Sequence, residues 1–145
     1  MAVMRCMVAT PTRALFEGEI TYAGIPGADG AYGVLPGHEL MLSLNRQGGV
    51  LTLDLGENGQ DRREFLIMGG ATQVFNDKVT VLARYGTAVE DIDEAAVRAE
   101  ADACRQIVAD LDQRNDPQDQ ATLETNRKML EWCEAQLNYV SGAAA

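Results

Sequence analysis

The feature that most constrains the fold is a change in the spacing of apolar residues near Gly86. Before it, short apolar or alternating runs are separated by glycine, and no helical repeat is present. After it, apolar residues recur at steps of three and four, which is typical of one face of a helix. The chain of 145 residues is therefore predicted to be an α+β protein, mainly β, with strands first and helices last.

The region 1–88 is predicted to be an antiparallel β-sandwich or flattened barrel, because short strands follow one another without intervening helices. Asn58-Gly59 and Asn76-Asp77 tolerate positive φ and suit tight hairpin turns. The candidate strands are Val3–Ala9, Ala14–Ile25, Gly48–Leu55, Arg63–Met68, Ala71–Phe75 and Lys78–Ala83.

The region 89–145 is predicted to be a two-helix hairpin. Asp91 and Glu94 have the spacing of a capping box for a first helix that ends near Gln113, and Asp116-Pro117 suits the start of a second. The two apolar stripes are Val97, Ala101, Cys104, Val108 and Leu111, then Leu123, Asn126, Leu130, Cys133, Leu137 and Val140. Narrow stripes make a lone hairpin marginal, so it needs support from the sandwich or a partner and is suited to switching.

Charge and composition exclude several classes of function. The formal net charge is −10, of which −7 falls after residue 90, so nucleic acid and anionic membrane surfaces are poor partners. Three widely spaced cysteines and one histidine argue against a structural metal site. No apolar run approaches the length of a membrane span, so we expect a membrane to be reached only through a partner.

Catalytic machinery is not evident, and no catalytic or metal-binding residue is predicted. His38 is the only histidine, so a catalytic triad would depend on that one residue. No phosphate-binding loop is present, and the glycines between Gly24 and Gly37 favour tight turns and close backbone approach.

The segment Pro26-Gly27, then Gly30-x-x-Gly33-Val-Leu-Pro36-Gly37-His38, resembles the signature of the epsilon subunit family of bacterial and chloroplast F-type ATP synthases, the counterpart of the mitochondrial delta subunit. Other segments agree in order: Leu15-Phe16-x-Gly18-Glu19, Gly69-Gly70, residues 78–83 and the acidic residues 90–94. The resemblance implies a ten-stranded sandwich followed by two helices, and a noncatalytic rotor subunit that links the gamma subunit to the c ring on the cytoplasmic side of the inner membrane. In many members the helices extend into the alpha/beta catalytic head and block ATP hydrolysis.

The resemblance also implies site residues. The family's c-ring and gamma contacts correspond here to Gly30, Ala31, Tyr32, Pro36, Gly37 and His38. Ala31 stands where an acidic residue is common, and His38 is either a contact residue or only a turn residue. Arg127 and Lys128 are the cations that the second helix offers for inhibitory contacts.

Some members bind ATP at the start of the first helix, where this chain offers Ile92, Asp93 and Arg98. The arginine is displaced by two residues, which turns it by about 200° around the helix. We therefore expect no cofactor and no ATP binding, with Asp93 acting as a helix cap. The alternatives are a stand-alone nucleotide-sensing or small-molecule-binding β-sandwich protein, and an enzyme that depends on His38.

Overall fold

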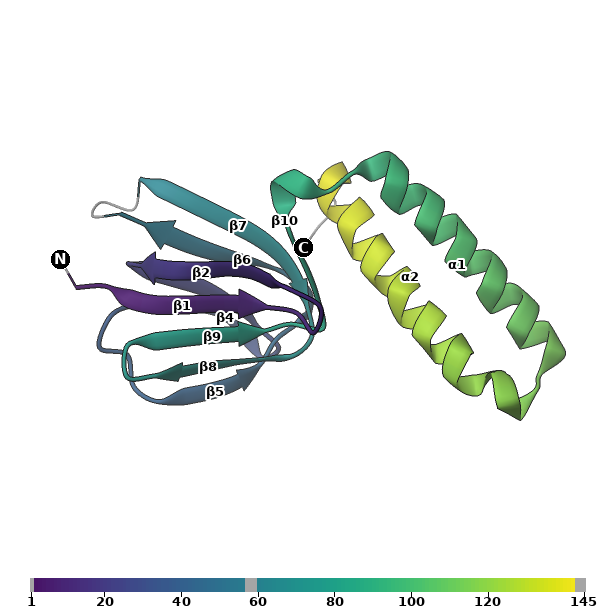
Figure 1. Cartoon of the computed structure of the whole chain (residues 1–145), viewed down its shortest axis with the longest axis horizontal. Helices are drawn as coiled ribbons and strands as arrows, with labels where there is room; N and C mark the ends of the chain where they lie inside the picture. The colour runs from purple at the N-terminus through teal and green to yellow at the C-terminus, as the bar shows by residue number, and fades with distance from the viewer. Residues whose placement is uncertain (1, 57–59, 143–145) are drawn as a thin grey trace. The chain divides into compact units, whose positions relative to one another are not determined.

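The computed structural model describes residues 2–56 and 60–142 and divides the chain into two compact units, Met1–Asp91 and Ile92–Ala145. The first unit consists of two five-stranded sheets packed face to face, and the second of two contacting antiparallel helices (Figure 1). The predicted boundary after Ala88 lies three residues before the division between the units.

The ten strands confirm the count that the family resemblance implied. They are β1 (Met4–Ala9), β2 (Ala14–Ile20), β3 (Tyr22–Gly27), β4 (Gly30–Val34), β5 (Met41–Leu44), β6 (Gln47–Leu55), β7 (Asp61–Met68), β8 (Ala71–Phe75), β9 (Lys78–Leu82) and β10 (Tyr85–Ala88).

One sheet has the order β2-β1-β9-β8-β5 and the other β10-β7-β6-β3-β4. All neighbours are antiparallel except β1 and β9, which run parallel from the Arg5–Lys78 pair to the Ala9–Leu82 pair. The inner faces meet in one apolar core, because alternate residues of each strand point inward. This core includes Val8, Ile25, Leu51, Ile67 and Val81, each no more than 1% exposed.

The prediction of a single strand over Ala14–Ile25 is wrong, because this segment forms two strands, β2 and β3. The chain leaves one sheet at Ile20 and enters the other at Tyr22. Both the N–H and the hydroxyl of Thr21 donate to the carbonyl of Asp54, at 2.8 and 3.2 Å. Since both sheets bury alternate residues toward the same core, the apolar pattern continues across this bend and does not mark it.

Three strands, β4, β5 and β10, were not predicted from the residue pattern. β4 is rich in glycine, and β5 and β10 have only four residues each, so each gives a weak alternating signal. The predicted turn at Asn58-Gly59 lies outside the described residues. The turn at Asn76-Asp77 is confirmed, with φ values of 51° and 56° that match a type I′ hairpin turn.

The two helices are α1 (Glu94–Arg114) and α2 (Gln120–Ser141). The expected cap at Asp91 is wrong, because Val89–Asp91 forms a separate 3-10 turn and α1 begins after it. The expectation that Asp93 acts as a helix cap is confirmed: it caps α1 and accepts a hydrogen bond from the Ala96 N–H at 3.2 Å. Asp116 caps a 3-10 turn at Pro117–Asp119, and α2 follows directly.

The apolar stripes meet along the hairpin as predicted for most positions. Val97, Ala101 and Cys133 form a buried cluster, against which Met129, Leu130 and Leu137 pack. Val140 was expected in the seam but is 42% exposed. Trp132 and Gln136 are buried although the predicted stripe omits them, so the buried face of α2 is wider than the spacing indicated.

Candidate docking surfaces

The residues predicted to contact partners do not lie in one loop. Gly30, Ala31 and Tyr32 open strand β4, whereas Pro36, Gly37 and His38 follow its far end. A five-residue strand spans roughly 15 Å, so the two groups lie at opposite ends of the sandwich. They share one feature: β4 is the edge strand of its sheet, so a partner lying along that edge could reach both groups.

The Leu35–His38 segment forms a tight turn. The His38 N–H donates to the Leu35 carbonyl at 3.1 Å, and Gly37 has a φ of 89°, which together with Pro36 matches a type II turn. The Gly37 N–H donates to Asp77 Oδ1 at 2.7 Å, so the β8–β9 turn holds this loop in place. His38 therefore has a structural role through its backbone, while its side chain remains partly exposed.

Tyr32, predicted as a partner contact, makes contacts within the sandwich. Its hydroxyl is hydrogen-bonded to the hydroxyl of Ser43, and the two residues come from β4 and β5, the edge strands of the two sheets. The side chain of Tyr32 packs against the core and is only partly exposed. It holds the two sheets together along this side of the sandwich.

A buried asparagine, Asn45, lies two residues after Ser43, directly beyond the end of β5. Asn45 is 3% exposed, and its Nδ2 donates to the carbonyls of Gly69 and Leu82, while its Oδ1 accepts from the Thr72 hydroxyl at 2.7 Å. A side chain at Gly70 would lie 1.8 Å from the Leu82 oxygen, so only glycine fits there. This packing gives the Gly69-Gly70 motif a physical reason.

The sandwich also carries an exposed apolar face that sequence reasoning missed. It is formed by the outward residues of β5, β8 and β9, and we call it the β5–β8–β9 face. Leu42 is 75% exposed, Leu44 69%, Leu82 51% and Phe75 50%. Cross-strand pairs place Leu44 beside Ala71 and Ala71 beside Leu82. Alternation within Lys78–Ala83 already directs Leu82 outward, but Leu42 and Leu44 belong to a strand that was not predicted.

The three residues considered for ATP binding each have a local role. Ile92 packs against the hairpin core, Asp93 caps α1, and Arg98 donates to Glu94 Oε1 at 3.2 Å one turn away. No hydrogen bond or ion pair joins any two of them among the described residues.

The two cations expected to make inhibitory contacts differ from each other. Arg127 Nη2 donates to Asp112 Oδ1 at 2.8 Å and so joins α2 to α1. Near the same end of the hairpin, Arg114 lies 3.5 Å from Asp119. Lys128 is exposed and has no ion pair within the described part of the chain.

Neither metal nor thiol chemistry is evident in residues 2–56 and 60–142. No group of three His, Cys, Asp or Glu side chains is arranged to hold a metal ion there. Burial raises the pKa of Cys6 to about 12 and that of Cys133 to about 11, so both remain protonated thiols near neutral pH. No helix in those residues is long and apolar enough to cross a membrane.

An exposed apolar face on a β-sandwich that is followed by a helical hairpin is typical of a protein that docks on another protein. Residues 3–89 match the family model described as ATP synthase, Delta/Epsilon chain, beta-sandwich domain. The chain therefore belongs to the ATP synthase delta/epsilon family, in its bacterial epsilon type, which is a noncatalytic part of ATP synthase.

Known proteins agree with this membership. The ATP synthase epsilon chain of Parvibaculum lavamentivorans is 31% identical over 117 residues, which cover 81% of this chain and 85% of the relative. A chain of the Euglena gracilis mitochondrial ATP synthase shares the fold, with a TM-score of 0.66 at 20% identity, covering 97% of this chain and 82% of the other. A chain of a Tetrahymena thermophila structure described as mitochondrial ATP synthase central stalk/c-ring has a TM-score of 0.51 at 13% identity, covering 61% and 68%.

Proposed function

We propose that this protein is a rotor subunit in the central stalk of a proton-translocating F-type ATP synthase, where it links the gamma subunit to the c ring. The observation that carries the proposal is the β5–β8–β9 face, with four large apolar side chains each at least half exposed. Monomeric proteins rarely expose contiguous apolar patches larger than a few hundred Å², so a partner is expected to cover this face. The description of the Tetrahymena relative as central stalk supports the same placement.

Two surfaces of the sandwich serve two partners in this proposal. The β5–β8–β9 face docks on the gamma subunit. The β4 edge, with exposed Gly30, Ala31 and Gly33, and the turn at Pro36–His38, lies on the c ring. The Tyr32–Ser43 hydrogen bond joins β4 to β5, so the two contact surfaces belong to one rigid body. A rigid link of this kind suits an element that transmits rotation.

The hairpin is proposed to regulate the complex. The described residues of the two helices include seven buried apolar side chains, against fifteen in the sandwich core, so the hairpin is held by a smaller core. The seven are Val97, Ala101, Cys104, Leu111, Leu123, Trp132 and Cys133. When the hairpin opens, the cations of α2, Arg127 and Lys128, become available to the alpha/beta catalytic head. The protein reaches the cytoplasmic side of the inner membrane only through the complex.

Two experiments test the proposal. The purified full-length chain is expected to bind purified gamma subunit, and a failure to bind would contradict the rotor function. The second experiment compares ATP hydrolysis by the assembled complex containing either the full chain or a version ending at Ala88. We expect faster hydrolysis with the shorter version, whereas equal rates would remove the regulatory role and leave the docking role intact.

A further inference from the structure

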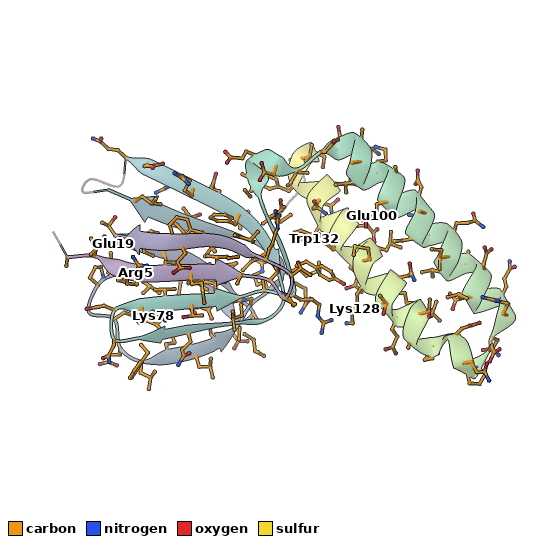
Figure 2. All side chains as sticks on the ribbon, in the orientation of Figure 1. Arg5, Glu19, Lys78, Glu100, Lys128 and Trp132 are labelled. Carbon is orange, nitrogen blue, oxygen red and sulfur yellow. The ribbon has the colours of Figure 1, made fainter. Side chains whose placement is uncertain are left out.

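The positive charges of this acidic protein are unevenly paired. Seven of the twelve Lys and Arg side chains form ion pairs with carboxylates. Within residues 2–56 and 60–142, the remaining cations make no ion pair: they are Arg13, Arg46, Lys78, Arg84 and Lys128. Three of these five border the β5–β8–β9 face. Figure 2 labels one of them, Lys78, at the start of β9.

The strand positions bring these three cations to the rim of the apolar face. Arg46 and Arg84 each follow an exposed leucine, Leu44 or Leu82, by two residues, and both are exposed. They flank Gly69: the Gly69 N–H donates to the Arg46 carbonyl at 2.8 Å, and a methyl group at Gly69 would lie 3.6 Å from Arg84 Cβ. Lys78 pairs with Phe75 at the other end of the same strands.

Negative charge is absent from this face. None of the 22 Asp and Glu residues lies in β5, β8 or β9, although the whole chain has a formal net charge of −10. The nearest acids in sequence are Glu39 and Asp77, both in connecting turns, and Asp77 already accepts a hydrogen bond from the Gly37 N–H. The face therefore carries apolar side chains around Gln73, which is exposed in the middle of β8. Arg46 and Arg84 lie at one end of the face, and Lys78, beside Asp77, lies at the other.

We propose that the surface of the partner seated on the β5–β8–β9 face is apolar with carboxylates placed against Arg46, Arg84 and Lys78. This inference rests on the proposed docking on the gamma subunit and specifies the chemistry of that contact. Rim charges of this kind mainly accelerate association and set its salt dependence. A second copy docked through the same face would bring like charges together in a two-fold contact, so the arrangement favours a different protein.

The experiment measures association of the full-length protein with purified gamma subunit at low and high ionic strength. The test variant is Arg46→Glu/Arg84→Glu. The matched control is Arg63→Glu/Arg105→Glu, which changes the net charge equally at two exposed arginines, one on β7 of the other sheet and one on α1. We expect the test variant to associate about tenfold more slowly at low salt and to lose most of the salt dependence. The control is expected to remain within about twofold of the unaltered protein.

Arg46→Lys/Arg84→Lys keeps the charge and is expected to restore the rate, which separates electrostatic attraction from local packing. Unfolding midpoints of all variants show that the sandwich is intact. Equal rates for test and control variants would overturn the inference while leaving gamma docking in place. A lack of binding by the unaltered protein at either ionic strength would overturn both the inference and the proposed function.

Discussion

Arg127 on α2 lies 2.8 Å from Asp112 on α1, and this ion pair joins the two helices near the loop that connects them. Both side chains are about half exposed, at 47% and 49%, so water and salt weaken the attraction. Arg127, which is proposed to contact the catalytic head, thus helps to hold the hairpin closed.

Replacing Arg127 with Gln is expected to destabilise the closed hairpin by roughly 0.2–1 kcal/mol, the range for exposed ion pairs. Amide hydrogen exchange in α2 measures the change, which should disappear at high salt. Lys128→Gln is the matched control, because Lys128 follows Arg127 in sequence and has no ion pair in the described residues. Equal effects of the two substitutions would contradict a specific role for the Asp112 pair.

Asn45→Ala is expected to destabilise the sandwich by roughly 1–3 kcal/mol, because it leaves the Thr72 hydroxyl and two backbone carbonyls without their partner in a buried site. Urea unfolding of the two proteins measures this loss. Gln73→Ala, an exposed change on the adjoining strand β8, should stay within about 0.5 kcal/mol of the unaltered protein. A loss of stability below about 0.5 kcal/mol for Asn45→Ala would contradict this prediction and show that water replaces the hydrogen bonds of the Asn45 side chain.

The buried thiols predict a loss of stability at alkaline pH. Their pKa values are raised from 9.0 to about 12 for Cys6 and about 11 for Cys133, so the folded protein retains protons that the unfolded chain releases. The contribution of these thiols to the free energy of unfolding is therefore fully present below pH 9.0 and is lost as the pH rises through about 11 and about 12. Urea unfolding across this range measures the slope. A Cys6→Ala/Cys133→Ala variant should lose that part of the slope, and an unchanged slope would refute the assignment.

Mixing the full-length protein with ATP and Mg²⁺ in a calorimeter is expected to give no binding heat at about millimolar nucleotide, a concentration that tests for binding free energies down to about −4 kcal/mol. The reason is that Ile92, Asp93 and Arg98 already pack, cap and pair within the hairpin. Heat that disappears in an Arg98→Ala variant would instead establish a nucleotide site at the start of α1.

Sequence reasoning succeeded where local chemistry decides the structure. Asn76-Asp77 accommodates positive φ in a turn, and Asp116-Pro117 begins a helical turn, because each residue type has a strong preference there. It failed at Thr21, where the chain changes sheet, since that step depends on which distant strand accepts the next segment. It offered both Asp91 and Asp93 as helix caps, because the two residues have the same chemistry, and only Asp93 caps α1.

Less of the candidate site than of the fold could be predicted from the sequence. The motif between Pro26 and His38 identified the family, but only the structure shows that β4 separates its two halves. Leu42 and Leu44 resemble core residues in the sequence, and their exposure follows from the register of β5 against β8. Nor does spacing indicate which arginines are paired, since Asp112 and Arg127 meet only across the hairpin.

The parallel pairing of β1 with β9 has a consequence for biosynthesis. Arg5 pairs with Lys78, which leaves the ribosome 73 positions later, so the amino-terminal strand waits with one unpaired edge while most of the sandwich is made. Until then β2 is its only neighbour, and a two-stranded ribbon is barely stable in water. The nascent chain is therefore most open to aggregation or to chaperone binding before residue 78 emerges. The sheet that contains β1 is completed only by β9, shortly before α1 is made.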